Sequence, residues 1–351
     1  MYIEINGRRI GPGYPLYIVA EMSANHCQDF DLAVKIIRIA KEAGADAVKI
    51  QTYTPDTLTI DCDDDLFKIK GTLWNGRTLH DLYGEAYTPW DWQPRLKEIA
   101  NELGIDLFST AFDETSVEFL ESMDVPAYKV ASFENVDLPL LRRIARTGKP
   151  VVISTGMATL AEIDEAVRTF REAGGRECAL LKCTSAYPAP SEGMNLRTIP
   201  HLMETFGVPA GLSDHTLDPA VPVAAVSLGA CIIEKHLSLS RSMPGPDSAF
   251  SLEPHEFSAM AFAARTAWKA LGTVSYGPTD AESASRVFRR SLFVVKDMKE
   301  GARFTPENVR SIRPGNGLHT RYLPNVLGRR AVRKIKRGTP LSWDLVGGEK
   351  D

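Results

Sequence analysis

The chain contains no hydrophobic run of 18 or more residues, and its start, "MYIEINGRRIGPG", lacks the apolar core and small-residue cleavage site of a signal peptide. We therefore expect a cytoplasmic protein without a membrane partner.

Only five cysteines occur among 351 residues, and they show no CxxC spacing. This odd number and irregular spacing argue against a disulfide framework or a structural zinc site, and we interpret the cysteines as reduced, mostly buried thiols.

Two common binding patterns are also missing. The chain has no GxxxxGK[ST] segment, so an anion is not held as in P-loop enzymes. Residues 286–337 carry 15 Lys plus Arg against 3 acids, which leaves −16 on the rest of a chain whose net charge is −4. The aromatic pattern, zinc spacing and recognition helix of nucleic-acid-binding modules are absent. We expect no nucleic-acid partner, and interpret this segment as a basic module that docks on an acidic body, its own or a partner's.

What the chain does have, from residue 16 to about 272, is a regular alternation of short apolar segments and amphipathic helical segments. The helical segments show a clear pattern. For example, "DLAVKIIRIAKEAG" places apolar residues at helical spacing and ends in Gly44, which predicts a helix that stops there. The eight predicted strands are residues 16–23, 46–52, 105–112, 126–132, 150–156, 178–185, 209–216 and 231–238. Eight such units predict an α/β fold, a TIM (β/α)8 barrel with its active site at the C-terminal ends of the strands.

Two segments break the repeat. Residues 53–89 form a βα connection far longer than the usual span of about 2 to 6 residues, and they either cover a substrate or form a surface excursion. The other is the C-terminal region, which has short predicted strands, many turns and no long amphipathic helix. We therefore predict a barrel domain at 1–275, a linker at 276–290 and a small domain of irregular β structure at 291–351.

Polar residues gather at the predicted strand ends. Residues two apart in a strand share a face, so several pairs are expected to point together into the barrel mouth. These pairs are Glu21 with Ser23, Lys49 with Gln51, Ser213 with His215, and Glu234 with His236. Polar groups buried in nearly every strand are costly without partners or a ligand, which favours a ligand site. The alternative is that the lysines pair with Glu21, Glu134 or Glu234 and bind nothing.

Two kinds of ligand fit these side chains. An anionic substrate with phosphate and carboxylate groups suits the point charges of Lys49 and Lys129 and the short hydroxyl donors around them. Those hydroxyls belong to Thr110, Ser132, Ser154 and Ser213. His215 and His236 end neighbouring strands, so their imidazoles could share one divalent metal. With only two protein ligands, such an ion keeps positions open for water or substrate, which suits a Lewis acid.

Nine motifs, in order, resemble those of the sialic acid synthase family, which condenses phosphoenolpyruvate with an amino sugar to form nonulosonic acids. They are "IVAEMSANH", "GADAVKIQTY", "STAFD", "YKVAS", "VVISTGMAT", "CTSAYPAP", "GLSDHT", "IEKHLSL" and "GPDSAFSLEP". The C-terminal "SIRPGNGL" is similar to the antifreeze-like (SAF) domain of these enzymes. The resemblance implies a TIM barrel followed by a linker and a β-clip SAF domain. It also implies a domain-swapped homodimer, in which the SAF domain of one subunit caps the barrel of the other.

The same resemblance implies roles for individual residues. By the family pattern, His215 and His236 bind a divalent ion, usually manganese or magnesium with cobalt as an alternative, and Glu21 and Glu134 stabilise charge or move protons. Phosphoenolpyruvate is held by Lys49, Thr110, Lys129, Ser132, Ser154 and Ser213, with Thr184 and Ser185 beside them. Glu21, Gln51, Tyr187 and Asp247 face the sugar, and Arg313 reaches across from the partner chain to an acetamido group.

Departures from the family pattern indicate one branch. The chain reads "KCTSAYP" where N-acetylneuraminate synthases read "HCTNIYP", so Ser185 replaces an asparagine near the phosphate and Lys182 a histidine. "GTLWNGRTLHDLYGEAYTPW" and "SRSMPGPDSAFS" resemble the pseudaminic acid branch, whose sugar is 2,4-diacetamido-2,4,6-trideoxy-L-altropyranose. Its extra acetamido group and missing 6-hydroxyl suit an apolar lid, with Leu73 and Trp74 as candidates. Synthesis of N-acetylneuraminate or legionaminate stays open as an alternative.

Two rival classes remain. A class I aldolase would form a Schiff base between pyruvate and one of four lysines, Lys49, Lys129, Lys182 or Lys235. A non-enzymatic protein would use the antifreeze-like region to bind ice or glycans, with an inert barrel attached. The second reading leaves the lysines and histidines at the strand ends unexplained.

Overall fold

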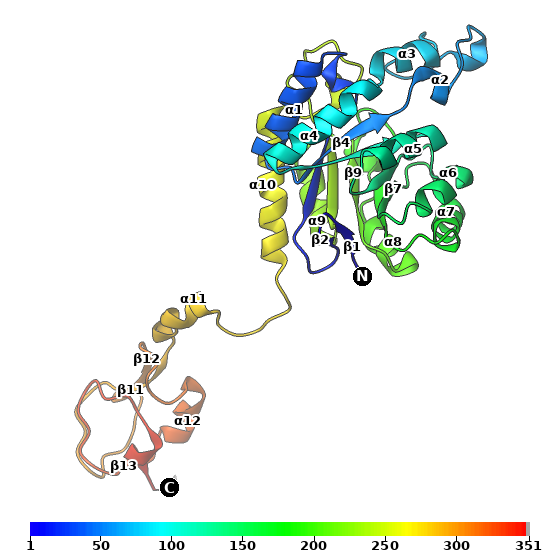
Figure 1. The fold of residues 1–351 in the computed structure, drawn as a ribbon. Coiled ribbons are helices and arrows are strands. Elements are labelled where there is room, and N and C mark those ends of the chain that lie inside the picture. Colours follow the sequence, from blue (N-terminus) through cyan, green and yellow to red (C-terminus); the bar gives the residue numbers. More distant parts are fainter. Residues whose placement is uncertain (349–351) are drawn as a thin grey trace. The chain divides into compact units, whose positions relative to one another are not determined.

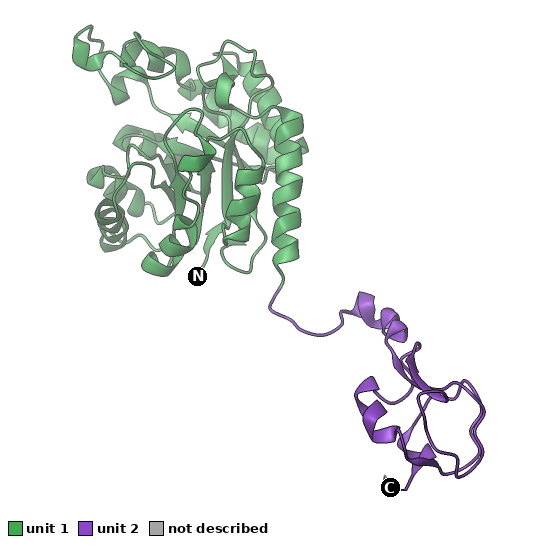
Figure 2. Cartoon of the chain, turned by 180° about the vertical axis from the view of Figure 1, so that it is seen from behind, with its two compact units in different colours: residues 1–272 green, residues 273–351 purple. Residues whose placement is uncertain are grey.

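The structure is a computed structural model that describes residues 1–348 (Figure 1). The chain separates into two compact units, Met1–Gly272 and Thr273–Asp351 (Figure 2). The last three residues of the predicted small domain, 349–351, lie outside the described residues.

The larger unit is built around a closed barrel of eight parallel strands, in the order β10-β3-β4-β5-β6-β7-β8-β9. The strands are β3 (Tyr17–Glu21), β4 (Ala47–Thr52), β5 (Asp106–Ala111), β6 (Tyr128–Val130), β7 (Val151–Ser154), β8 (Cys178–Cys183), β9 (Ala210–Asp214) and β10 (Ile232–His236). Each lies within a strand predicted from the sequence, whose outer residues belong to the adjoining loops. The TIM-barrel prediction is confirmed.

Helices, most of them amphipathic, cover the outside of the barrel. They are α1 (Phe30–Glu42), α4 (Gln93–Leu103), α5 (Glu114–Ser122), α6 (Leu138–Ala145), α7 (Leu160–Glu172), α8 (Thr198–Phe206), α9 (Ala220–Ser227) and α10 (Pro254–Leu271). In α1, Asp29 caps the first turn by accepting a hydrogen bond from the Leu32 amide, and the buried residues Ala33, Ile36, Ile37 and Ala40 recur at helical spacing. This local pattern is what orients each helix against the strands.

A short N-terminal hairpin, which the sequence analysis did not identify, fills the end of the barrel opposite the strand C-termini. It consists of β1 (Ile3–Ile5) and β2 (Arg8–Ile10), paired antiparallel (Figure 1). Ile3, Ile5 and Ile10 are fully buried and pack in one cluster with barrel residues such as Phe108 and Leu181. The apolar filling at this end leaves the C-terminal end of the barrel as the place for polar chemistry.

The long β4–β5 connection forms a small substructure above the C-terminal ends of the strands (Figure 1). It contains α2 (Pro55–Leu58), η2 (Asp65–Phe67), α3 (Leu79–Ala86) and η3 (Trp90–Trp92). The hydroxyl oxygens of Thr54 and Thr78 accept hydrogen bonds from backbone amides in the first turns of α2 and α3. These caps explain why two short helices begin where they do.

The smaller unit has its own apolar core, which includes Leu292, Val294 and Phe304. Its elements are α11 (Asp280–Ser283), η6 (Ala284–Phe288), β11 (Ser291–Val294), β12 (Val309–Ile312), η7 (Thr320–Tyr322), α12 (Leu323–Val326), β13 (Arg330–Ala331), η8 (Trp343–Leu345) and β14 (Val346–Gly347). The strands pair as β11–β12 and β13–β14, both antiparallel. Across residues 1–348, no helix has the length and apolar character needed to span a bilayer.

Candidate active site

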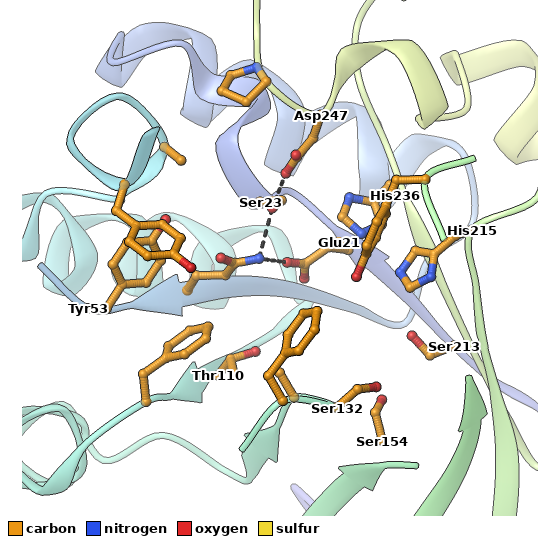
Figure 3. A pocket seen from close by; sticks show the side chains of 18 of the residues that line it. Glu21, Ser23, Tyr53, Thr110, Ser132, Ser154, Ser213, His215, His236 and Asp247 are labelled. Carbon is orange, nitrogen blue, oxygen red and sulfur yellow. Dashed lines mark hydrogen bonds between the residues drawn. The ribbon is translucent and has the colours of Figure 1, made fainter. Parts of the chain in front are cut away.

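A cavity of about 390 Å³ lies at the C-terminal ends of the barrel strands, a size that suits a small-molecule site. Thirteen of the sixteen residues predicted from the sequence line it. They are Glu21, Lys49, Gln51, Thr110, Lys129, Ser132, Glu134, Ser154, Tyr187, Ser213, His215, His236 and Asp247. Figure 3 shows that the labelled residues among them, from different strands, point into one space.

Strand register explains why these residues meet. Glu21 pairs with Lys49 on one side and with His236 on the other. Thr110 likewise pairs with Gln51 on β4 and with Lys129 on β6. Paired residues of neighbouring parallel strands point to the same face of the sheet, so the register brings these side chains together at the barrel mouth.

The bottom of the cavity is a compact charged cluster, which we call the polar floor (Glu21, Lys49, Lys129, Ser213 and Glu234). Lys49 Nζ lies 2.6 Å from Glu21 Oε2 and 3.8 Å from Glu234 Oε1. Lys129 Nζ and Ser213 Oγ donate hydrogen bonds to Glu234 Oε1 at 3.2 and 3.1 Å. All five residues are at most 5% exposed. The two lysines therefore pair with Glu21 and Glu234 in this structure. Burial, together with the nearby Glu234 carboxylate, raises the pKa of Glu21 despite the opposing charge of Lys49.

Besides Glu21 Oε2, which ion-pairs with Lys49, four buried polar atoms that line the cavity make no hydrogen bond within the described part of the chain. They are Glu134 Oε2, Ser154 Oγ, Glu234 Oε2 and His236 Nδ1. Buried polar atoms in folded proteins almost always have a partner, so four exceptions in one cavity indicate a place for water or a ligand. Burial also raises the pKa of Glu134 to about 7, so this carboxyl can hold or release a proton near neutral pH.

A hydrogen-bonded chain crosses from the first two barrel strands to the loop after β10. Gln51 Nε2 donates to Glu21 Oε1 at 2.9 Å and to Ser23 Oγ at 2.8 Å, and the Ser23 hydroxyl donates to Asp247 (Figure 3). Burial raises the pKa of Asp247, and the hydrogen bond from Ser23 opposes this effect. This chain holds oxygen acceptors in fixed positions on one side of the cavity, where they can receive hydroxyl groups.

The two histidines lie side by side, with ring centroids 5.3 Å apart. The His215 Nδ1 lies 3.0 Å from the Thr184 carbonyl oxygen, which can only accept, so Nδ1 carries the proton and Nε2 a free lone pair. Burial lowers the pKa of His236 well below its ordinary value, so its imidazole is neutral. No group of three or more His, Cys, Asp and Glu residues in the part of the chain described here is arranged to hold a metal. The two imidazoles can nevertheless provide two ligands, with water or substrate as the rest.

Three predicted residues do not line the cavity. The Thr184 hydroxyl donates to the Gly193 carbonyl at 3.2 Å, and the Ser185 hydroxyl lies 3.9 Å from Cys183 Sγ. Arg313 belongs to the smaller unit, where its guanidinium lies 5.9 Å from the centre of the Phe288 ring. Of the two lid candidates, Trp74 lines the cavity, whereas Leu73 is 55% exposed and is not among the described lining residues.

Several lining residues were not predicted as site residues. Tyr53 and Phe112 continue the two-residue alternation of Lys49, Gln51 and Thr110 just past the ends of β4 and β5, so parity could have identified them. Glu234 was considered only as a partner for the histidine and the lysines, and Cys183 only as a buried thiol. Other lining residues come from the β4–β5 connection, and we call this set the apolar wall: Leu58, Ile69, Trp74, Leu79, Leu82 and Tyr83.

The fold is a TIM barrel, and its mouth contains two buried lysines, a cluster of carboxyl groups and a histidine pair. These features define a class of enzyme that acts on small anionic substrates. The chain belongs to the NeuB family, whose model matches residues 36–276. The SAF domain model matches residues 289–347. Both matches confirm the family and the C-terminal domain identified from the motifs.

Individual relatives agree with this assignment. The chain is 44% identical to a pseudaminic acid synthase of Helicobacter pylori over 332 residues, 94% of this chain and 97% of the relative. It is 46% identical to a pseudaminic acid synthase of Campylobacter jejuni over 326 residues, 93% and 95% of the two chains. A solved N-acetylneuraminic acid synthetase from Leptospira borgpetersenii has a TM-score of 0.72 and 30% identity, covering 81% of this chain and 95% of that one.

Proposed function

We propose that this chain condenses phosphoenolpyruvate with 2,4-diacetamido-2,4,6-trideoxy-L-altropyranose and water to give pseudaminic acid and phosphate. The observation that carries the proposal is the cavity itself, where buried lysines, orphaned polar atoms and a histidine pair converge. Identities of 44 and 46% to pseudaminic acid synthases, against 30% to an N-acetylneuraminic acid synthetase, support this sugar.

The proposed reaction forms one carbon–carbon bond and breaks one carbon–oxygen bond. C3 of phosphoenolpyruvate attacks the aldehyde carbon of the open-chain sugar, water adds to C2, and phosphate leaves with the bridging oxygen. Lys49 and Lys129 are suited to hold the phosphate and carboxylate, because both are buried cations at the cavity floor. The hydroxyls of Thr110, Ser132, Ser154 and Ser213 add short donors around them.

Glu134 is the carboxyl best suited to move a proton in this reaction. Its pKa of about 7 matches the pH at which a general acid or base works efficiently. Glu21 instead is held by Lys49 and Gln51, which suits it to stabilise positive charge that develops near C2. We therefore assign proton transfer to Glu134 and electrostatic stabilisation to Glu21.

His215 and His236 are the proposed ligands of a divalent ion, manganese or magnesium, with cobalt as an alternative. Their rings are adjacent, and the buried His236 Nδ1 has no hydrogen-bond partner in residues 1–348, so the pair fits such an ion. When bound, the ion would supply Lewis-acid polarisation of the aldehyde oxygen. The chain's own contribution is to keep the buried His236 imidazole neutral and to fix the orientation of His215 through its hydrogen bond to the Thr184 carbonyl.

We further propose a cytoplasmic homodimer with swapped SAF domains, and a domain division at 1–275, 276–290 and 291–351. In this arrangement Arg313 of one subunit contacts an acetamido group in the cavity of its partner. The basic residues 286–337 and the opposite charge on the rest of the chain support an electrostatic docking of this kind. Mixing inactive Arg313→Ala and His215→Ala subunits tests it, because a swapped dimer regains one intact site and unswapped subunits regain none.

The experiment that tests the proposed reaction measures phosphate release with phosphoenolpyruvate, manganese and three sugars in parallel. The sugars are the pseudaminic precursor, the legionaminic precursor and N-acetylmannosamine. We expect the pseudaminic precursor to be used best, and preference for either of the others would contradict the assignment. Borohydride trapping with pyruvate separates the class I aldolase, which alone predicts a covalent lysine adduct.

A further inference from the structure

One side of the cavity is the apolar wall, which the β4–β5 connection supplies. The condensation reaction itself does not require this apolar surface. Residues 53–86 contribute nine of the lining residues, and none of the nine is charged. Leu58, Ile69 and Leu79 line the cavity and are only partly buried, so some of their apolar surface is uncovered. The polar floor and the apolar wall therefore offer a ligand two opposite kinds of surface.

The apolar wall is held in place near the C-terminal end of the connection and at Trp74, which we call its tip. Gln28 Nε2 donates to the carbonyl oxygens of Glu85 and Tyr87 at 3.1 and 2.6 Å. Trp74 Nε1 donates to the Pro246 carbonyl at 3.2 Å, which ties the tip to the loop after β10. The Trp74 ring also contacts the Tyr187 ring, with the two ring centroids 5.8 Å apart. These contacts make the connection a fixed boundary of the cavity, and they argue against a surface excursion.

Apolar surface of this kind gains free energy only when a ligand covers it with apolar groups of its own. A hydroxyl placed against Leu58, Ile69 or Leu79 would lose its water partners, and these three side chains offer no replacement. The surface therefore favours a ligand with methyl groups on the side away from the reacting aldehyde. Charge on that side of the ligand would be disfavoured for the same reason.

We infer that the apolar wall is the surface that determines sugar specificity, by contacting the C6 methyl and the methyl of the 4-acetamido group. This inference rests on the proposed function, which supplies a sugar with both groups. Ile69 is central to it, since its backbone is fixed by hydrogen bonds with Arg77 and Gly76 at 2.9 Å while its side chain faces the cavity. A substitution at Ile69 can thus change the wall's polarity without changing its backbone.

The test compares two sugars that differ by one oxygen, the 6-deoxy sugar and its 6-hydroxylated analogue, 2,4-diacetamido-2,4-dideoxy-L-altropyranose. We expect the wild type to favour the 6-deoxy sugar in kcat/KM by about 100-fold. Ile69→Thr and Leu58→Asn should each reduce that preference by about tenfold, mainly through the KM of the deoxy sugar. The KM of phosphoenolpyruvate should stay unchanged, because the polar floor is untouched.

Matched controls come from the same connection. Ile69→Val keeps the wall apolar and should retain the preference, and Leu66→Asn alters a residue that is 91% exposed. Equal losses for both sugars in Ile69→Thr, or an equal shift in Leu66→Asn, would overturn the inference. So would a wild type that turns over both sugars equally well. A wild type that releases no phosphate with the deoxy sugar is a different result, and it contradicts the proposed function instead.

Discussion

The polar floor and the apolar wall meet in one cavity but are built in different ways. The polar floor comes from five different barrel strands, one residue from each, and every residue is buried and hydrogen-bonded or ion-paired to its neighbours. The apolar wall comes from one irregular connection between β4 and β5, and part of it is exposed to the cavity. Rigid strands suit groups that must be positioned accurately for a reaction, whereas a connection can change without disturbing them. We therefore assign the chemistry to the polar floor together with Glu134 and the histidine pair, and the choice of sugar to the apolar wall.

The largest effect should follow from changing the histidine pair above the polar floor. His215→Ala removes one of two proposed metal ligands, so kcat/KM should fall by about 10³-fold or more while the fold is retained. Manganese titration followed by electron paramagnetic resonance should show weaker binding, and circular dichroism should remain like that of the wild type. His255→Ala, at a histidine whose side chain is 78% exposed, is the matched control. Undiminished manganese-dependent turnover in His215→Ala would remove the metal assignment.

A second prediction concerns the support behind the histidines. The side chains of Lys235 and Asp214 form a 2.6 Å ion pair with no solvent exposure. Lys235→Met leaves the Asp214 charge buried and unpaired, so the free energy of unfolding should fall by about 3 to 5 kcal/mol. Arg95→Met, in an exposed pair with Glu98, should leave the free energy of unfolding close to that of the wild type. Urea unfolding of both variants measures this contrast, and equal losses would contradict it.

The pKa of Glu134 gives a third prediction, for stability against pH. In the unfolded chain this carboxyl ionises near pH 4.3, whereas burial raises its pKa to about 7 in the folded protein. The folded state therefore loses stability as pH rises from about 4 to 7, by about 4 kcal/mol, and stays lower above pH 7. Glu134→Gln should be more stable than the wild type by that amount at pH 8 and similar to it at pH 4. Thermal unfolding across this range measures the difference, with the exposed Glu192→Gln as control.

The smallest predicted effect lies on the apolar wall. Trp74→Phe keeps an aromatic ring but removes the hydrogen bond to the Pro246 carbonyl, which should cost about 1 kcal/mol of stability. The KM of the sugar should rise modestly, and the KM of phosphoenolpyruvate should not change. A rise in the KM of phosphoenolpyruvate instead would show that the polar floor and the apolar wall are not separate in function.

Much of the polar floor could be predicted because side chains alternate between the two faces of a strand with a period of two residues. Apolar runs located all eight barrel strands, and two-residue parity then placed Lys49 and Gln51 on the inner face. The N-terminal hairpin was missed because three-residue strands carry too short a pattern to recognise. The same parity, carried two residues further, would have included Tyr53.

The apolar wall could not be predicted residue by residue, because an irregular connection has no period. Leu73 and Trp74 are adjacent and both apolar, yet only Trp74 turns toward the cavity, held by its bond to Pro246. That choice depends on backbone turns and on a contact 172 residues away along the chain. The spacing of residues in the sequence shows neither these turns nor this distant contact.

The central claim is that the cavity joins C3 of phosphoenolpyruvate to the sugar while water attacks C2. Phosphoenolpyruvate labelled with ¹⁸O at its bridging oxygen tests this most directly, with 2,4-diacetamido-2,4,6-trideoxy-L-altropyranose as the second substrate and mass spectrometry of both products. Our account predicts that the label appears in the released phosphate, because the bond between C2 and the bridging oxygen breaks. Label retained in the organic product would mean that the phosphorus–oxygen bond breaks, and would contradict the account.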